Sequence, residues 1–314
     1  SRALARSRAV RAATGAWWSG PPRGVALRTV YEMHAAAAMR LAAAGVPSPE
    51  ADAWRLMEAA TGSSRSALLL SGAQPLDSAA AERLALLVEK RAARVPLQHI
   101  LGSADFYGLE LAVDGRVLVP RPETERLVEL VLHELARQTM THFAGSTPQL
   151  VIDVGTGSGA VALAVKAERP DTQVWGTDVS DDALAVARGN AARLGLDVGF
   201  MRSDLLRDDA AAALARRATA LVANLPYLPE ADRANLQPEA VADPPGALFA
   251  ADGGLALAAR LADQAWSALP RGALLALELD PRNVRGLAAR LGGWEDVRVE
   301  QDLAGRERFL VARR

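Results

Sequence analysis

Apolar side chains in residues 28–103 recur at the spacing of amphipathic helices. In the first predicted helix, positions three or four residues apart share one face: they are Leu27, Val30, Met33, Ala37 and Leu41. Gly45 is expected to end that helix. Ser48-Pro49-Glu50 and Asp77-Ser78 supply capping residues for two further helices. The pattern therefore predicts a small, all-helical domain over residues 28–103.

The period changes from helical to alternating over residues 104–119. Every second residue from Leu109 to Val113 is apolar, and the apolar run 117–119 follows Asp114-Gly115. Asp-Gly between two such runs is typical of a tight hairpin turn. We therefore expect a β-hairpin linker over residues 104–119, with its turn at Asp114-Gly115.

Strands and helices are predicted to alternate in the rest of the chain. After a helix from about Pro122 to Arg137 and a surface loop over 138–149, apolar runs lie at 150–154, 173–177, 198–202, 219–223 and 273–279. Helical patterns lie at 158–168, 181–194, 209–217 and 253–269. This alternation predicts an α/β fold with a largely parallel sheet buried on both faces. Two last strands, at 296–301 and 307–312, are expected to pair antiparallel at one edge.

Composition excludes several classes of protein. The 314 residues contain no cysteine, so disulfides, thiol nucleophiles and cysteine-ligated zinc are ruled out. The formal net charge of −1 argues against a protein that coats nucleic acid non-specifically. No run reaches the ~18 apolar residues that a membrane-spanning helix needs. We therefore expect a soluble, intracellular protein.

The N-terminal segment differs in charge from the rest of the chain. Residues 1–31 carry six arginines and no acid, whereas the remainder has 30 basic and 37 acidic side chains. Such a start resembles an organellar transit peptide, although it lacks the apolar core of a secretory signal. We interpret residues 1–27 as a disordered basic extension and place the protein in a bacterial cytoplasm, with an organelle as the alternative.

The first candidate site is a glycine-rich turn between a buried strand and a helix. Its residues are Asp153, Val154, Gly155, Thr156, Gly157, Ser158 and Gly159. Glycines allow the backbone to adopt positive φ and to approach a ligand closely. A dinucleotide-binding fold would show G-x-G-x-x-G. The spacing here is G-x-G-x-G, which resembles the S-adenosylmethionine loop of class I methyltransferases.

Two acidic residues end the next two predicted strands. Asp178 can accept hydrogen bonds from both hydroxyls of a ribose. That fits either a dinucleotide or S-adenosylmethionine, and a helix N-cap is the alternative role. Asp204 can accept from an adenine amine, or it can begin the following helix.

The sequence Asn224-Leu225-Pro226-Tyr227 follows the fourth predicted strand and decides between these classes. A planar amide or aromatic nitrogen has a delocalised lone pair. Two acceptors that grip its N–H bonds, the Asn224 side-chain oxygen and the Leu225 carbonyl, would fix its plane for attack on a methyl sulfonium. Pro226 would stiffen the turn and Tyr227 could pack on the flat substrate group. Ideal alignment contributes about 7–11 kcal/mol to lowering such a barrier.

With these residues in place, the chain resembles the glutamine N5-methyltransferases that modify class I peptide-chain release factors. The resemblance covers most of the chain after about residue 28 and includes motifs more specific than the glycine-rich loop. These are Gln98-His99-Ile100-Leu101-Gly102, Phe106-Tyr107-Gly108, Val117 to Glu125, Pro238-Glu239, Ala247-Leu248, Asp252-Gly253-Gly254-Leu255 and Asp302 to Arg308.

The resemblance implies a fold, a cofactor and a substrate. The fold would be a Rossmann-like class I methyltransferase domain over residues 120–314, with a mostly parallel seven-stranded sheet and an antiparallel edge. S-adenosylmethionine would be bound by Asp153, Gly155 to Gly159, Asp178, Asp204, Leu205 and Asn224. The glutamine of a Gly-Gly-Gln loop would be held by Asn224 to Tyr227. The helical domain would recognise the release factor.

Two departures from the family pattern leave alternatives open. Leu225 stands where the family usually has proline, and Asn-Leu-Pro-Tyr also resembles the motif of ribosomal RNA adenine dimethyltransferases. Glu278-Leu279-Asp280 stands where Glu-Ile-Gly is common, so the loop beside the cofactor is expected to differ. An RNA or DNA adenine methyltransferase and a ribosomal-protein glutamine methyltransferase are the alternatives. The acidic balance of residues 32–314 disfavours the first, and we expect no direct nucleic-acid partner and no membrane partner.

Overall fold

The computed structural model describes residues 28–141 and 148–314. The extension predicted for residues 1–27 lies outside the described residues, as does the centre of the surface loop predicted for 138–149. No helix in the described ranges is long and apolar enough to cross a membrane.

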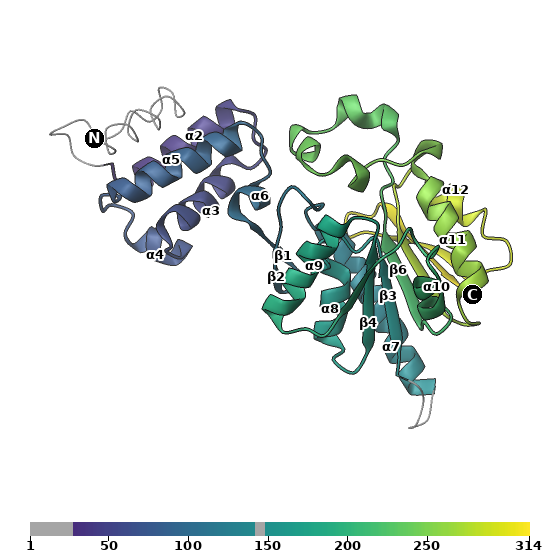
Figure 1. The fold of residues 1–314 in the computed structure, drawn as a ribbon. Helices are drawn as coiled ribbons and strands as arrows, with labels where there is room; N and C mark the ends of the chain where they lie inside the picture. Colours follow the sequence, from purple (N-terminus) through teal and green to yellow (C-terminus); the bar gives the residue numbers. More distant parts are fainter. Residues whose placement is uncertain (1–27, 142–147) are drawn as a thin grey trace. The chain divides into compact units, whose positions relative to one another are not determined.

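The described chain forms two compact units (Figure 1). One contains residues 28–101 and the short segment Pro238–Ala242. The other contains residues 102–237 and 243–314.

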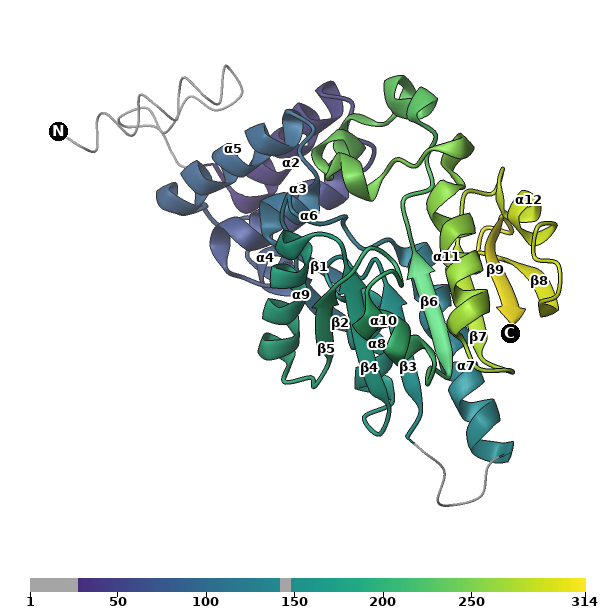
Figure 2. The same cartoon turned by 45° about the vertical axis from the view of Figure 1, so that its right-hand side comes forward.

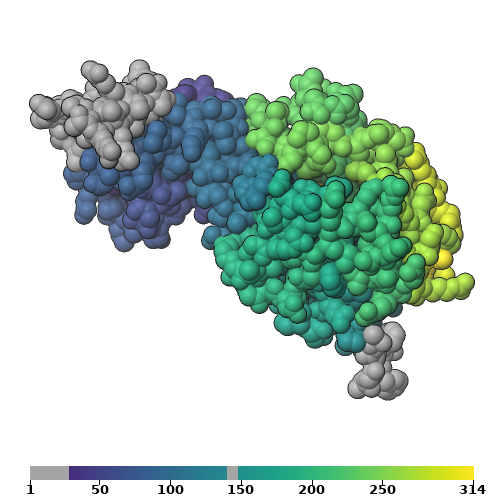
Figure 3. Space-filling model, viewed as in Figure 1, coloured from purple at the N-terminus to yellow at the C-terminus, as the bar shows by residue number. Residues whose placement is uncertain are grey.

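The first unit is helical, as its apolar pattern predicts. The largest side chains of its core are fully buried: Met33, Leu41, Leu56, Met57 and Leu84. In space-filling view its side chains form a closely packed body, coloured purple to blue (Figure 3). The helices are α2 (Val30–Ala43), α3 (Pro49–Thr61), α4 (Arg65–Leu70), α5 (Ser78–Ala92) and α6 (Leu97–Leu101).

Capping residues fix the ends of these helices. The Asp77 carboxylate accepts from the Ala80 amide at the start of α5, as its position predicts. Gly45 follows α2 with φ of 72°. Ser48 is the residue before α3, but its side chain makes no capping hydrogen bond. Pro49, at the first helical position, therefore favours the start of α3.

A segment distant in sequence completes the helical unit. The Glu239 carboxylate accepts from Arg91 Nη1 at 2.8 Å and from Arg94 Nε at 2.6 Å. Arg91 also donates to Asp52 at 2.7 Å and is almost fully buried. Burial opposes ionisation of Glu239, but the two arginines outweigh it and lower its pKa to about 2. The ion pairs thus anchor Pro238–Ala242 among the helices.

The second unit is built on a seven-stranded sheet with the order β5-β4-β3-β6-β7-β9-β8 (Figure 2). All neighbouring strands are parallel except β9, which runs antiparallel to both β7 and β8. This confirms the predicted fold class and the antiparallel edge. The strands are β3 (Leu150–Val154), β4 (Gln173–Asp178), β5 (Gly199–Arg202), β6 (Ala220–Asn224), β7 (Leu274–Glu278), β8 (Glu295–Gln301) and β9 (Glu307–Arg313).

Helices cover both faces of this sheet, which is why its central strands are apolar throughout. One core lies between the sheet and α7 (Glu125–Thr141), α8 (Ala160–Glu168) and α9 (Asp181–Leu194). The other lies between the sheet and α10 (Asp209–Ala215), α11 (Ala256–Ala268) and α12 (Val284–Ala288). Figure 2 shows α10 and α11 in front of the strands and α7 and α8 behind them.

The hairpin lies earlier in the chain than its sequence pattern predicts. Strand β1 (Ser103–Phe106) pairs antiparallel with β2 (Leu109–Ala112) through the two-residue turn Tyr107-Gly108. Both turn residues have positive φ, 48° and 75°, as a type I′ turn requires. The predicted turn at Asp114-Gly115 is wrong as a hairpin turn, although Val117 N does donate to Asp114 O.

No strand follows Asp114-Gly115 because the apolar residues there pack elsewhere. Val117 and Val119 are buried against Ala183 and Val186 of α9. Contact with a helix thus replaces the strand pairing that their alternation suggests, and it brings the segment 116–121 to the carboxyl edge of the sheet.

Short 3₁₀ helices connect β6 to α11 and precede α7. They were not distinguished by the sequence pattern, because a single helical turn leaves no periodicity to detect. The segments are η2 (Pro122–Thr124), η3 (Glu230–Asn235), η4 (Pro238–Ala242), η5 (Pro245–Ala247) and η6 (Asp252–Gly254).

Replacing Glu134 by glutamine should destabilise the second unit, and less so in acid. The buried Glu134 carboxylate on α7 accepts from both terminal nitrogens of Arg313 on β9, at 2.8 and 2.7 Å. Burial opposes its ionisation, but hydrogen bonds from Arg137, Arg313 and Gln138 outweigh it and lower the pKa to about 2. The ionised form therefore stabilises the fold fully above the unfolded pKa of 4.5, and that contribution fades as pH falls towards 2.

We expect the Glu134→Gln variant to lose about 2–4 kcal/mol of unfolding free energy at pH 7. Denaturant titrations at pH 7 and pH 3.5 should show the gap from the parent protein shrinking at the lower pH. Glu129→Gln, on the exposed side of the same helix, is the matched control and should change stability by less than ~1 kcal/mol. A gap that is equal at both pH values would contradict the assignment.

Candidate active site

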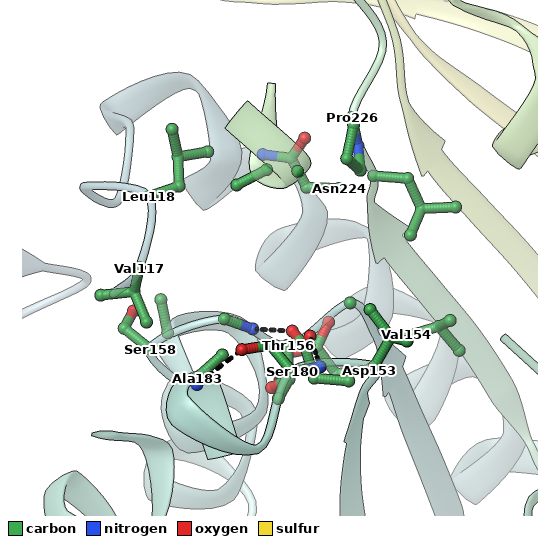
Figure 4. A pocket seen from close by; sticks show the side chains of 18 of the residues that line it. Val117, Leu118, Asp153, Val154, Thr156, Ser158, Ser180, Ala183, Asn224 and Pro226 are labelled. Atoms are coloured by element: carbon green, nitrogen blue, oxygen red, sulfur yellow. Dashed lines mark hydrogen bonds between the residues drawn. The ribbon is translucent and has the colours of Figure 1, made fainter. Parts of the chain in front are cut away.

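A cavity of about 330 Å³ opens at the carboxyl edge of the sheet. This is where connections from β3 and β6 leave in opposite directions, the usual ligand crevice of an open α/β sheet. Figure 4 shows Asn224 and Pro226 on one side of it, Val117 and Leu118 on another, and Thr156 and Ser158 below. The lining comes from segments 116–121, 153–158, 178–180, 203–205, 224–226 and 244–247, with Thr124 among the single residues.

The glycine-rich loop is held in shape by Asp153. Its carboxylate, almost fully buried at the end of β3, accepts from Thr156 Oγ1 at 2.6 Å and from the Ala162 amide at 3.2 Å. Burial raises the pKa of this carboxyl to about 6, against the effect of those two hydrogen bonds. Asp153 lines the cavity, but at least one of its carboxylate oxygens is hydrogen-bonded to the loop itself. Its role therefore includes shaping the turn.

Asp178 lies at the end of β4, as predicted, and its carboxylate faces the glycine-rich loop. It accepts from the Gly157 amide at 3.0 Å and from the Ser180 amide at 2.9 Å. Burial raises its pKa. Ser180, not Asp178, caps α9 through the Ala183 amide, so the N-cap alternative for Asp178 is wrong.

Asp204 and Leu205 reach the cavity from the end of β5. The Asp204 carboxylate pairs with Arg260, and the residue that precedes α10 is Asp208, so the helix-start alternative for Asp204 is wrong. Leu205 is buried with φ of 56°, an unusual conformation for leucine. Its carbonyl accepts from the buried Ser203 hydroxyl at 2.8 Å, which helps to hold it there.

Asn224 ends β6 and lines the cavity together with Leu225 and Pro226. Asn224 Nδ2 donates to Thr124 Oγ1 at 3.0 Å. Tyr227 is not among the lining residues. Its hydroxyl is 3.5 Å from Arg308 Nη1, and burial raises its pKa.

Two residues at the site were missed as functional candidates by sequence reasoning. Thr124 Oγ1 donates to Glu278 Oε2 at 2.7 Å, and both side chains are buried. Burial raises the pKa of Glu278 to about 7, although Thr124 and Arg308 act to lower it. Glu278 is the strand partner of Asn224, so its nearness could have been inferred from the sheet order. For Thr124 the only signal was its place within the Val117 to Glu125 motif.

The residues at this edge fit S-adenosylmethionine. At Gly157, whose φ is 55°, an added Cβ would meet nothing within 4 Å, so the loop leaves open space beside Asp178. The Asp178 carboxylate at the end of β4 and the Asp204 carboxylate just beyond β5 can accept hydrogen bonds from the hydroxyl and amine groups of a nucleoside.

Comparison with known proteins bears on what this edge does. Two protein-family models match this chain. The model of the "PrmC N-terminal domain" matches residues 32–102, and the model of the "Methyltransferase domain" matches residues 151–242. A release factor glutamine methyltransferase of Deinococcus radiodurans is 48% identical over 280 residues, which cover 88% of this chain and 96% of that protein. This chain belongs to the release factor glutamine methyltransferase family. The Escherichia coli member is 35% identical over 85% of this chain and 92% of its own.

As a member of this family the chain is an S-adenosylmethionine-dependent methyltransferase. Among solved structures, the catalytic domain of human METTL16 in complex with an RNA hairpin matches with a TM-score of 0.53 at 18% identity. That match covers 72% of this chain and 81% of the METTL16 chain. At this identity the likeness shows a shared fold and says nothing about the substrate.

The structure accommodates Leu225, which replaces the proline usual in the release factor glutamine methyltransferases. Its side chain is buried against Gly155, where an added Cβ would lie 2.8 Å from Leu225 Cδ2. Gly155 also has φ of 73°. The glycine therefore makes room for the leucine, and Leu225 lines the cavity.

The second departure from the family pattern, at Asp280, is held by a neighbouring arginine. The Asp280 carboxylate binds Arg282, accepting from its backbone amide at 2.8 Å and its guanidinium at 2.7 Å. No residue of 278–282 lines the cavity within the described chain. The expected difference between this loop and the family pattern stays a prediction.

Proposed function

We propose that this chain methylates the side-chain amide nitrogen of the glutamine in the Gly-Gly-Gln loop of class I release factors. Family membership supports the reaction class, and the orientation of Asn224 supports the type of atom that is modified. Because Asn224 Nδ2 is bound to Thr124, Oδ1 is the atom left to accept from a substrate N–H. Within the described residues, Oδ1 has no hydrogen-bond partner, and it belongs to a residue that lines the cavity.

The proposed chemistry needs positioning more than it needs a base. When bound, S-adenosylmethionine supplies an electrophilic methyl group on a sulfonium. Asn224 Oδ1 and the Leu225 carbonyl would accept the two N–H bonds of the substrate amide and hold its nitrogen in one orientation. Pro226 keeps the turn rigid, since its φ is fixed. The methylated nitrogen is strongly acidic, so its proton can leave to water without a dedicated base.

The remaining parts of the proposal concern binding and compartment. The glycine-rich loop, Asp178, and Asp204 with Leu205 would hold the nucleoside end of S-adenosylmethionine. The helical unit would recognise the release factor. The named relatives are bacterial proteins, and we propose that this chain acts in the cytoplasm, where release factors meet the ribosome.

Methyl transfer from labelled S-adenosylmethionine tests this proposal directly. The substrates are a purified class I release factor, its variant with alanine in place of the loop glutamine, and total RNA. We expect label on the unaltered factor alone. Label on RNA, with none on the factor, would overturn the proposal and favour an adenine methyltransferase.

A further inference from the structure

Asn224 has an amide group whose two ends look alike in shape but differ in chemistry. Its oxygen accepts hydrogen bonds and its nitrogen donates them, so a rotation of 180° about χ2 would present the wrong group to a substrate N–H. Something in the protein must therefore select one orientation for the proposed reaction to proceed efficiently.

The hydrogen bonds around Thr124 make that selection. A threonine hydroxyl has one proton to donate. Thr124 donates it to Glu278 Oε2 at 2.7 Å, so its oxygen can only accept from its other neighbour. That neighbour is Asn224, whose Nδ2 lies 3.0 Å away. When Glu278 is ionised its carboxylate can only accept, so it dictates the direction of both hydrogen bonds.

Three elements from distant parts of the chain supply these residues. Thr124 lies at the end of η2, Asn224 at the end of β6, and Glu278 at the end of β7. Asn224 and Glu278 are paired in register on neighbouring parallel strands, so the sheet itself fixes their separation. Thr124 is 5% exposed and Glu278 is 2% exposed, so water competes little for these bonds.

We propose that Thr124, oriented by Glu278, is a positioning residue that keeps Asn224 Oδ1 turned to the substrate amide. This inference rests on the proposed function, because it assumes that Asn224 binds an N–H donor. It assigns a task to a residue of the Pro-Arg-Pro-Glu-Thr-Glu motif, which lies about 100 positions before Asn224 in sequence. Neither Thr124 nor Glu278 needs to touch the reacting atoms.

Two substitutions at Thr124 separate this role from simple packing. Valine has the same shape but no hydroxyl, whereas serine keeps the hydroxyl and loses the methyl group. We expect Thr124→Val to lower kcat for methylation of the release factor by about 10- to 100-fold, since misalignment on this scale costs that much. KM for the factor and Kd for S-adenosylmethionine should stay within about threefold. Thr124→Ser should retain kcat within about threefold.

A matched control and a readout without turnover complete the design. Thr172 is a buried threonine whose hydroxyl has no hydrogen-bond partner in the described chain, so Thr172→Val should leave kcat unchanged. By NMR, the side-chain amide protons of Asn224 should exchange slowly with water in the parent protein and in Thr124→Ser. They should exchange faster in Thr124→Val.

The outcomes distinguish this inference from the proposed function. If the parent protein does not methylate the release factor, the proposed function fails. If it does, and Thr124→Val keeps full kcat or Thr124→Ser loses as much as valine does, the positioning role fails. Should the valine variant not fold, Thr124→Ala supplies the same comparison with serine.

Discussion

Replacing Asn224 by alanine is expected to lower kcat for methylation of the release factor by at least about 100-fold, while the affinity for S-adenosylmethionine stays within about threefold. Alanine removes the side-chain oxygen that would align the substrate amide, and a single preorganised polar group of this kind is worth about 10²- to 10³-fold in kcat. It leaves the glycine-rich loop and Asp178 in place. Single-turnover rates with saturating factor and calorimetry with S-adenosylmethionine would measure the two effects separately.

Two further variants show whether the Asn224 result is specific. Asp178→Ala should instead weaken the binding of S-adenosylmethionine. The Asp178 carboxylate also holds the Gly157 and Ser180 amides in place, so its loss should disturb the glycine-rich loop. Asn235→Ala, on the exposed helix η3, should leave both quantities within about twofold. Activity of Asn224→Ala within severalfold of the parent protein would rule out the amide clamp.

Gly254→Ala is expected to damage both stability and turnover, although residue 254 does not line the cavity. An added Cβ would lie 2.0 Å from the backbone carbonyl oxygen of Tyr227, closer than any real contact. Gly254 also has φ of 95°, which alanine adopts only with strain. Because the obstacle is backbone, relief requires Tyr227 to move, and the turn Asn224 to Tyr227 with it.

We expect Gly254→Ala to lose about 2–4 kcal/mol of unfolding free energy and at least about 30-fold in kcat. Gly253→Ala is the matched control, because Gly253 has φ of 62° but nothing within 4 Å of an added Cβ. It should show only the backbone strain, about 1 kcal/mol, with kcat close to normal. Denaturant titration and methyl-transfer rates would compare them. Equal effects of the two substitutions would mean that contact with Tyr227 is not what matters.

Much of the fold could be predicted from sequence because its elements are long and regularly patterned. Every strand of the seven-stranded sheet was predicted to within about two residues, as were the helices that follow β3 and β4. The hairpin was misplaced because Tyr107 occupies a turn position that more often holds asparagine or glycine. The alternating apolar positions of Val117 and Val119 predict a paired strand, but these side chains are buried against α9 instead.

The candidate site was partly predictable for a different reason. Parallel strands deliver their carboxyl ends to one edge, so Asp178, Asp204 and Asn224 could be expected to converge once the strands were recognised. The Thr124–Glu278 hydrogen bond joins residues 154 positions apart and depends on how η2 meets β7. No local pattern encodes such a bond. Nor could the sequence alone reveal that the Tyr227 hydroxyl points to Arg308.

The anchoring of Glu239 among the helices has a consequence for dissecting this enzyme. The polypeptide leaves the second unit after residue 237 and rejoins it at 243, so the helical unit has no single boundary at which it could be cut away. A fragment of residues 28–101 would keep Asp52 but lose Glu239, leaving Arg94 without that carboxylate and the buried Arg91 with half of its present charge compensation. The fragment should be less stable than the same helices within the whole enzyme, and a peptide carrying residues 238–242 should restore part of the loss.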